Sequence, residues 1–399
     1  MPQTEKILKS EAEIKEEILA RRGISENPKK NVRNAVDKLG KPDSSYKTIL
    51  VGGSNGKGST VEMIAELLKS QGFNVGVSKS PHLVEVNERI RFNDSKVTNR
   101  ELAELYREIE DIEVNLAFYE FMSTASYLYF GKKNVDYAVV EIGKGGVYDS
   151  RNAVKSEIST ITNIQLEHTE LLGENKKEIA EKIGGITPKK GKIVTNEEYA
   201  GIEMLAEHRN CEIKKPFRLE KDNGKYIYNS KKFEIPLRGS FQRENLENAL
   251  KTVDEVEELP ENLTEAFSDL SSPGRMEIMS KEPLYIHDGA HNPAAVKKVI
   301  QDLPEKFICI FNSTKGSRHK EMIKKLEEKA EKFYITSSEF FKSEKPEKIA
   351  EKCEKDFEIE ENPDIAEKKA LSEGKEKSTP VVAIGSLYLI GRLREQVKH

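Results

Sequence analysis

Residues 47–60 read KTILVGGSNGKGST, and this stretch decides the fold. Its first part, Lys47–Val51, is a short apolar run typical of a buried strand. A glycine-rich turn follows, and a helical pattern then runs from about Ser59 to Gln71. A turn placed between a strand and a helix presents backbone N–H groups and the helix N-terminus to phosphate oxygens. The order therefore predicts a phosphate-binding loop at Gly53–Thr60.

The side chains of this loop suit a nucleotide triphosphate with Mg²⁺. Lys57 is placed to reach the β- and γ-phosphates, and the hydroxyl of Ser59 or Thr60 to bind the metal. In the common P-loop pattern Ser or Thr directly follows the Lys, whereas Gly58 intervenes here. A plain glycine-rich turn is the alternative, but four glycines around a lone Lys favour the phosphate loop. The predicted ATP contacts in the loop are Asn55, Gly56, Lys57, Gly58, Ser59 and Thr60.

Strand-like runs alternate with helical patterns on both sides of the loop. An amphipathic helix is expected at Ile24–Leu39, and a strand at Asn74–Ser78 after Gly72 ends the helix that follows the loop. The β-branched runs Val135–Ile142 and Ile158–Ile164 are typical of strands buried in a parallel sheet. This alternation predicts an α/β fold with a doubly wound sheet.

A second series of strands begins after SSPG at Ser271–Gly274, which has the composition of a linker. Its expected strands are Leu284–His287, Phe307–Phe311, Phe333–Thr336 and Pro380–Ile384. A chain of 399 residues is also long for a single core. We therefore predict two domains, residues 1–270 with the phosphate loop and residues 271–399 as a smaller α/β domain.

The composition excludes several classes of function. A formal net charge of -4, with Lys and Glu intermixed, gives no basic surface for nucleic acid. No apolar run approaches the roughly 20 residues that a membrane span needs. The three cysteines are widely spaced and suggest neither a metal-ligand pair nor a disulfide framework. The N-terminus, MPQTEKILKSEAEIKEE, lacks a signal-peptide core. We expect a cytoplasmic protein that acts on small molecules.

Three polar side chains stand where strands are expected to end. Glu141 closes VVEIGKGG, His168 follows the strand that ends near Ile164, and Ser80 follows Asn74–Ser78. In an open α/β sheet ligands gather beyond the carboxyl ends of the strands. Oxygen ligands with an imidazole suit a divalent cation beside a triphosphate. Each residue alone is as consistent with an ordinary surface position, so the prediction of a metal site rests on their combination.

The second half contributes SPGRMEI and LYIHDGAHNP. Arg275 stands at a strand edge, where a guanidinium can bind phosphate bidentately, and Asp288 can accept from ribose hydroxyls. DGAHNP is equally compatible with a turn in which Asn292 and Pro293 start a helix, and the residues alone leave both open. A nucleotide held by two domains would explain why these residues lie so far from the loop in sequence.

In their order along the chain, the motifs resemble the folylpolyglutamate synthase and dihydrofolate synthase branch of the Mur ligase superfamily. They are GSNGKGS at 53–59, SPHL at 80–83, NERIR at 87–91, EIGKGG at 141–146, LEHTELLG at 166–173, SPGR at 272–275 and DGAHNP at 288–293. The resemblance extends from about Asn27 to Val397, and GSLYLIGRLRE at 385–395 is similar to the entry of the family's C-terminal helix.

The resemblance implies an ATP-dependent ligase that activates a pteroate or folate carboxylate as an acyl phosphate and joins it to L-glutamate. It implies a monomer with a Mur-ligase-type first domain and a Rossmann-like second domain, ATP and Mg²⁺ as cofactors, and room for a monovalent cation such as K⁺. By resemblance, the metal is assigned to Ser59, Ser80, Glu141 and His168, further ATP contacts to Asn245, Arg275, Asp288 and His291, and a pterin contact to Ser123. The predicted catalytic residues are Lys57, His168 and Lys182.

Departures from the family pattern keep a rival function open. In EIGKGGVYDSRN an apolar residue and an Arg of the family are replaced by Lys144 and Val147, although Asp149 and Asn152 remain. Ser54 and Glu167 stand where the family prefers Thr and Asp. The alternative is a ligase of the same superfamily acting on another acid or amino acid, such as a peptidoglycan-like or poly-amino-acid substrate. A third interpretation is a non-catalytic nucleotide-binding protein. The presence of all the expected metal- and phosphate-binding residues argues against it.

The largest departure lies in EIAEKIGGITPKKG at 178–191. The family has a carbamylated Lys there that helps to hold a second metal. Aligned without a gap, that Lys falls at Ile183, and Lys182 precedes it. A shift of one residue rotates a helical side chain by about 100°. Either the helix is locally adjusted and carbamylated Lys182 takes the role, or the second metal is held differently.

Overall fold

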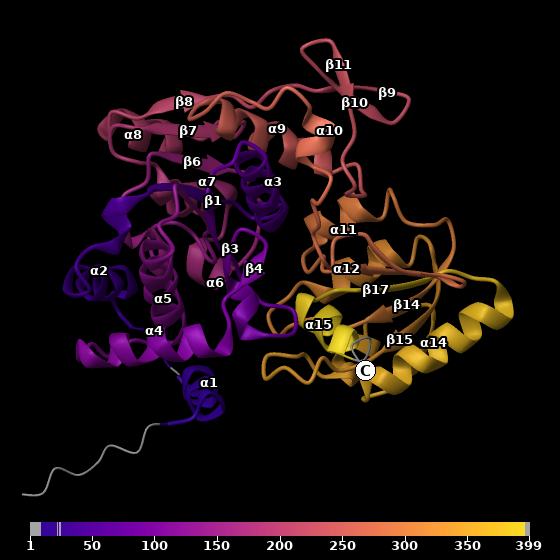
Figure 1. The fold of residues 1–399 in the computed structure, drawn as a ribbon. Helices are drawn as coiled ribbons and strands as arrows, with labels where there is room; N and C mark the ends of the chain where they lie inside the picture. Colours follow the sequence, from indigo (N-terminus) through magenta and orange to yellow (C-terminus); the bar gives the residue numbers. More distant parts are fainter. Residues whose placement is uncertain (1–8, 22, 24, 396–399) are drawn as a thin grey trace, which may run out of the picture. The chain divides into compact units, whose positions relative to one another are not determined.

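The computed structural model describes residues 9–21, 23 and 25–395, which form two compact units (Figure 1). The first unit runs to residue 80 and includes 86–218 and 247–266; the second comprises 81–85, 219–246 and the chain from 267. The polar segment before residue 9, Ile24 and the end of the resemblance at Val397 lie outside the described residues. The division at residue 270 drawn from the sequence stays a prediction.

The first unit contains an eight-stranded sheet in the order β4-β3-β2-β5-β1-β6-β7-β8. All strands from β2 to β8 in this order pair in parallel, and β3 and β4 add an antiparallel edge. The strands are β1 Lys47–Gly52, β2 Val75–Ser78, β3 Ile90–Phe92, β4 Ser95–Lys96, β5 Tyr137–Glu141, β6 Ile158–Ile161, β7 Lys192–Thr195 and β8 Glu212–Lys214.

Helices cover both faces of this sheet, because successive side chains of its central strands point to opposite faces and are buried on both. Leu50, Ala138 and Val140 belong to one core with α1, α2, α4, α5 and α7, whereas α3 packs on β1, β2 and β5 from the opposite face. The helices are α1 Glu11–Ala20, α2 Pro28–Lys38, α3 Lys57–Lys69, α4 Asn99–Asp111, α5 Phe118–Lys132, α6 Thr169–Leu172, α7 Lys176–Ile183, α8 Ala200–His208, α9 Gln242–Asp254 and α10 Leu263–Ala266, with 3₁₀ turns η1 Pro42–Ser45, η2 Val86–Arg89, η3 Ser150–Ala153 and η4 Gly184–Ile186.

The second unit contains a six-stranded sheet in the order β12-β13-β17-β14-β15-β16, parallel apart from the antiparallel edge strand β12. A small antiparallel sheet, β11-β10-β9, belongs to the same unit. The strands are β9 Glu220–Asp222, β10 Lys225–Tyr228, β11 Lys231–Phe233, β12 Glu277–Lys281, β13 Leu284–Asp288, β14 Phe307–Phe311, β15 Ala330–Ile335, β16 Asp356–Ile359 and β17 Val381–Ile384.

The large sheet of the second unit is also covered on both faces. One core contains residues of α11 Pro293–Val299, α12 His319–Leu326 and α13 Pro346–Ala350, and a second core contains residues of α14 Pro363–Lys377 and α15 Leu387–Glu395. The predicted fold class, a parallel α/β unit with the phosphate loop and a smaller α/β unit, is confirmed. No helix of the described chain has both the length and the apolar character needed to cross a bilayer.

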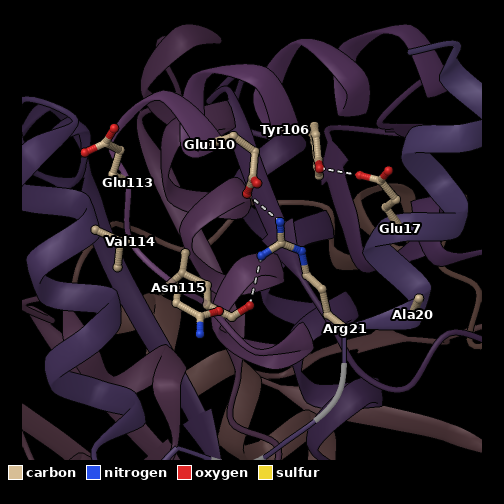
Figure 2. Close-up of a pocket in the computed structure, with 9 residues that line it drawn as sticks. Glu17, Ala20, Arg21, Tyr106, Glu110, Glu113, Val114 and Asn115 are labelled. Carbon is tan, nitrogen blue, oxygen red and sulfur yellow. Dashed lines mark hydrogen bonds and ion pairs between the residues drawn. The ribbon is translucent and has the colours of Figure 1, made fainter.

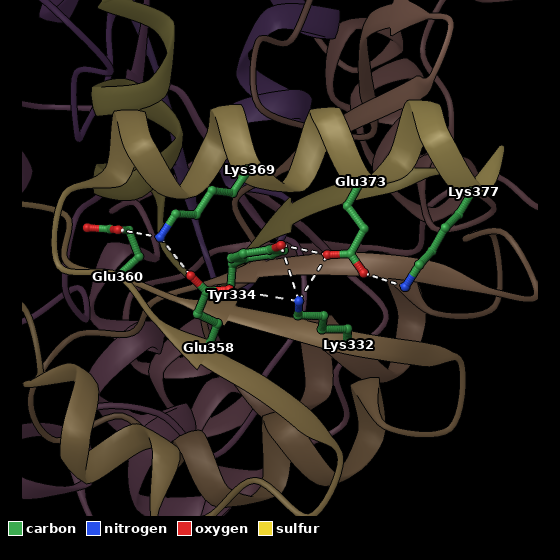
Figure 3. Close-up of polar contacts among 7 residues, drawn as sticks. All are labelled: Lys332, Tyr334, Glu358, Glu360, Lys369, Glu373 and Lys377. Atoms are coloured by element: carbon green, nitrogen blue, oxygen red, sulfur yellow. Dashed lines mark hydrogen bonds and ion pairs between the residues drawn. The ribbon is translucent and has the colours of Figure 1, made fainter.

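Polar contacts fasten α14 to the strands beneath it (Figure 3). Lys369 donates to Glu358 and Glu360, and Glu373 accepts from Tyr334 at 2.6 Å and from Lys332 at 3.0 Å. Burial acts to raise the pKa of Glu373, but hydrogen bonds from Lys377, Tyr334 and Lys332 outweigh it and lower the pKa to about 2. These side-chain contacts join α14 to β15 and β16.

Candidate active site

The loop between β1 and α3 adopts a backbone conformation that requires glycine at two positions. Gly53 has φ of 125°, and a Cβ atom there would overlap the Thr162 hydroxyl. Gly56 has φ of 85° and immediately precedes α3. L-residues with side chains rarely adopt such positive φ values, which lie in the range that glycine tolerates. The sharp turn places the first turn of α3 directly after the carboxyl end of the central strand β1.

The extension of β6 fixes the loop from one side. The backbone N–H groups of Ser54 and Asn55 donate to the carbonyl and side-chain oxygens of Asn163 at 2.8 and 3.1 Å. In return the Asn163 amide and the Thr162 hydroxyl donate to the carbonyl of Asn55 at 2.8 and 2.7 Å. This is why β6 ends at Ile161 and not at Ile164 as expected: the next two residues use their polar groups on the loop.

Lys57 lies across the loop that precedes it. Its Nζ donates to the carbonyls of Gly53 at 2.7 Å and Ser54 at 2.9 Å. Ser59 and Thr60 are buried in the first turn of α3, and the Thr60 hydroxyl has no hydrogen-bond partner among the described residues. The helix begins at Lys57, two residues before the expected start. An ammonium group and a helix N-terminus are thus combined, as an anion-binding site requires.

Ser80 and Glu141 meet beside the N-terminus of α3. The backbone N–H of Ser80 donates to Glu141 Oε2 at 2.8 Å. The other carboxylate oxygen, Oε1, lies 3.8 Å from where a Cβ of Gly58 would be. The two residues come together because β2 and β5 are parallel neighbours, and β5 also pairs with β1. Two of the three residues predicted at strand ends therefore lie together next to the phosphate loop.

His168 immediately precedes α6 and lies close enough to Lys57 for the lysine's charge to act on it. Burial, and then the cations Lys144 and Lys57, lower the pKa of His168 to about 4, while Glu170 opposes the shift. Its Nδ1 lies 3.8 Å from Glu170 Oε1. A neutral imidazole is the form that can bind a metal. The preceding carboxyl group, Glu167, is partly buried, and this burial raises its pKa against the opposing effect of Lys57.

Arg151, at the 3₁₀ turn η3, is a residue of this region that the sequence analysis missed. Its Nη1 atom donates to the hydroxyl of Ser80 and to the carbonyl of Glu141, both at 2.7 Å. The sequence run VYDSRN offered one usable signal, namely an Arg beside the retained Asp149 and Asn152. Asp149 in the same run accepts from the N–H groups of Gly143 and Lys144 at 2.8 and 2.9 Å and so holds the turn after β5.

Lys182 points away from the core and contacts an aromatic side chain. Its Nζ lies 3.4 Å from the Tyr148 hydroxyl and 5.3 Å from the centre of that ring. Helix α7 runs through both positions in question, and Ile183 is buried. The backbone carbonyl of Lys182 accepts from Gly146 and Val147. A catalytic or carbamylated Lys182 therefore stays a prediction.

Ser123 is buried within α5 and contacts η3. Its hydroxyl donates to the carbonyl of Tyr119 at 2.7 Å and lies 2.8 Å from the Ser150 hydroxyl. The guanidinium carbon of Arg89 lies 5.0 and 5.6 Å from the ring centres of Phe118 and Tyr119. Aromatic rings and serines thus gather at the start of α5, and the pterin contact of Ser123 stays a prediction.

In the second unit, Asp288 organises the turns around it. Its two carboxylate oxygens accept from the N–H groups of Met276 and Ala290, each at 2.8 Å. Burial raises the pKa of Asp288, whereas Arg275 and these two hydrogen bonds oppose the shift. Of the two other predicted residues, Asn245 donates to Gln242 at 2.9 Å, and His291 Nδ1 lies 3.1 Å from the Gly289 carbonyl. Their assignment to ATP stays a prediction.

A separate pocket of about 660 Å³ lies in the first unit between α1 and the end of α4 (Figure 2). Arg21 spans it, donating to the carbonyl of Leu116 at 2.9 Å and to Glu110. Glu17 accepts from Tyr106 at 2.5 Å at its other side. None of the residues predicted for the active site lines this pocket.

Comparison with known proteins yields two domain matches. The Mur ligase middle domain matches residues 51–253, and the Mur ligase glutamate ligase domain matches residues 274–387. A folylpolyglutamate synthase of Lacticaseibacillus casei is 30% identical over 302 residues, which cover 67% of this chain and 70% of that protein. A dihydrofolate synthase/folylpolyglutamate synthase of Bacillus subtilis is 27% identical over 92% of this chain and 94% of its own length.

A further relative is much longer. The probable bifunctional folylpolyglutamate synthase/dihydropteroate synthase of Haloferax volcanii is 28% identical over 91% of this chain, which spans 48% of that protein. Among solved structures, E. coli FolC in complex with DHPP and ADP superposes with a TM-score of 0.89 at 21% identity, covering 100% of this chain and 99% of that one. A Yersinia pestis bifunctional folylpolyglutamate synthase/dihydrofolate synthase with AMPPNP and Mn superposes with a TM-score of 0.90 at 21% identity, and both chains are fully covered. The fold is therefore shared along the whole chain.

Proposed function

The chain belongs to the Mur ligase family and, within it, to the folylpolyglutamate synthases, and from this premise we propose that it is an ATP-dependent ligase that joins L-glutamate to a pteroate or folate carboxylate. The products are dihydrofolate or folylpolyglutamate, ADP and phosphate. The observation that carries the proposal is the meeting of Ser80 and Glu141 beside the phosphate loop and Lys57. In this proposal residues 1–270 bind ATP and the pterin, and residues 271–399 form the glutamate ligase domain.

The residues at the loop fit a divalent cation that is shared with a triphosphate. The described chain contains no group of three His, Cys, Asp or Glu side chains that would form a complete cage. Mg²⁺ is usually held by one or two carboxylates together with substrate phosphates and water. Glu141, the Ser80 hydroxyl and the neutral imidazole of His168 supply such a partial set, to which the Ser59 hydroxyl adds. When bound, the cation would offset negative charge on the phosphates.

The chain's own groups then position the reactants for two displacements. Lys57 and the N-terminus of α3 hold the phosphates while a carboxylate oxygen of the pterin substrate attacks the γ-phosphorus, so that an O–P bond forms and ADP leaves. The amine of L-glutamate next attacks the carbonyl carbon of the acyl phosphate. An amide bond forms, phosphate leaves, and the amine gives up a proton to solvent. In this proposal the protein acts as a monomer in the cytoplasm on these small molecules.

Mass spectrometry of the products tests the proposal. Dihydropteroate and tetrahydrofolate are each incubated with ATP and L-glutamate, and ADP release should require the pterin acid and glutamate together. Lys57→Ala should abolish ADP release, because the ammonium that faces the phosphates is lost. Lys155→Ala, which removes a lysine with an 80% exposed side chain from the same unit, should leave it unchanged. Turnover of ATP that ignores both substrates, or that needs a muramyl or peptide acid instead, would contradict the proposal.

A further inference from the structure

Arg151 is a buried cation without a carboxylate partner. Its side chain belongs to a residue that is 3% exposed, and in the described part of the chain its guanidinium forms no ion pair. Buried charges in proteins are usually paired, because their removal from water is costly. The guanidinium instead donates to two backbone carbonyls, those of Lys79 and Glu141, and to the hydroxyl of Ser80. The acceptors of this cation therefore all belong to the region of the candidate metal site.

The contacts of Arg151 join the ends of two neighbouring strands. Lys79 and Ser80 follow β2, Glu141 closes β5, and Arg151 reaches both from η3 with distances of 3.0, 2.7 and 2.7 Å. Arg151 is itself held in place, since its N–H donates to Asp149 at 2.9 Å and its carbonyl accepts from the Tyr127 hydroxyl. The guanidinium is thus held in a fixed position next to Ser80 and Glu141, the two residues beside the phosphate loop.

The bond from Arg151 restricts what the Ser80 hydroxyl can do. A hydroxyl has two lone pairs and one proton. One lone pair accepts the hydrogen bond from Arg151, which fixes the side-chain rotamer of Ser80. One lone pair then remains to bind a metal ion. The N–H of the same residue is bound to Glu141 Oε2, which leaves Oε1 on the side of Gly58. Ser80 is therefore held at both its backbone and its side chain.

We propose that Arg151 is a positioning residue that orients the Ser80 hydroxyl toward the divalent cation accompanying ATP. The proposal rests on the proposed function, because it needs a metal–nucleotide complex at the phosphate loop. Outer contacts that orient a metal ligand commonly change metal affinity by about 10- to 100-fold when they are removed. Arg151 acts in this way through Ser80, without touching the substrate or the metal.

A double-mutant cycle in the full-length protein tests this role. Mn²⁺ binding at saturating ADP is measured by electron paramagnetic resonance for the wild type, Arg151→Met, Ser80→Ala and the double variant. Arg151→Met should weaken Mn²⁺ binding about tenfold or more. The double variant should be no weaker than Ser80→Ala alone, because the arginine has nothing left to orient. Losses that multiply in the double variant, or an Arg151→Met protein with wild-type Mn²⁺ affinity, would overturn the proposal.

Two controls separate positioning from folding. Arg209→Met removes another arginine that donates to two backbone carbonyls, those of Gly185 and Thr187, and should leave Mn²⁺ affinity unchanged. If Arg151→Met does not fold, Arg151→Lys replaces it in the same cycle, because lysine keeps the charge and can make one of the three bonds. Affinity for metal-free ADP should stay within about twofold of the wild type. A wild-type protein that binds no Mn²⁺ with ADP would refute the proposed function itself, a result distinct from an unaffected Arg151 variant.

Discussion

Replacing His287 with leucine should stabilise the second unit, and more strongly in acid than at neutral pH. His287 is fully buried on β13, with its ring edge-on to Tyr285 at 4.6 Å between ring centres. Neither ring nitrogen has a hydrogen-bond partner among the described residues. A buried polar group without a partner costs roughly 1–3 kcal/mol. The side chain therefore occupies a position that suits an apolar residue, and its two nitrogen atoms form no hydrogen bonds with the described residues.

The size of the acid effect follows from the pKa of His287. Burial, and then the charge of Arg394, lower this pKa to about 3 from the ordinary 6.5. The unfolded chain thus binds the proton more tightly than the folded one, so the stability is fully present above pH 6.5 and is lost as the pH falls toward 3. The gap corresponds to about 5 kcal/mol in the limit, of which about 2 kcal/mol is lost between pH 7.5 and pH 5.

Hydrogen exchange and urea unfolding at pH 7.5 and pH 5 measure the effect. The free energy of opening β13, followed by mass spectrometry of its peptides, should fall by about 2 kcal/mol more in the wild type than in His287→Leu over this pH range. The comparison between two proteins cancels the titration of all other groups. His208→Gln changes an exposed histidine of α8 and should show the wild-type pH dependence. Parallel pH profiles for the wild type and His287→Leu would refute the reasoning.

Two further predictions concern the phosphate loop and the contacts of α14. Gly53→Ala should lower the free energy of unfolding by about 2–4 kcal/mol and weaken ADP binding, because the residue has φ of 125° and its Cβ would overlap Thr162. Gly72→Ala, at φ of 88° with open space around its Cβ, should cost only about 1 kcal/mol and leave ADP affinity intact in calorimetry. Glu373→Gln should cost about 1–3 kcal/mol at pH 7, because the pKa of Glu373 is lowered to about 2 by its partners (Figure 3). That loss should fade as the pH falls from 4.5 toward 2, where the carboxyl group becomes protonated in both states, and a pH-independent loss in urea titrations would contradict the assignment.

Local patterns predicted those parts of the fold that depend on a single segment. The strand β1, the turn at Gly53 and Gly56, and the helix after it follow from an apolar run, glycines and a helical period in adjacent residues. Strands β13 and β14 start at the expected residues for the same reason. The end of β6 was placed three residues too late, because the β-branched Thr162 and Ile164 continue the strand pattern, whereas Thr162 and Asn163 bind the loop. A segment's own sequence does not record such a distant partner.

The active site divides in the same way between single positions and pairings. Ser80 and Glu141 lie together beside the loop because Ser80 follows β2 and Glu141 ends β5, and parallel neighbours bring their carboxyl ends to one edge. Arg151 was missed because its partners are two carbonyls and one hydroxyl from strands 10 to 72 residues away, and a carbonyl leaves no trace in a sequence. Lys182 shows the converse. The 3.6-residue helical period alone predicts that the side chains of Lys182 and Ile183 point in different directions. In the structure Ile183 is buried, whereas Lys182 contacts Tyr148. Residue type therefore predicts a site where the chain's own geometry aims the side chain, and fails where a backbone atom from another strand decides what the side chain does.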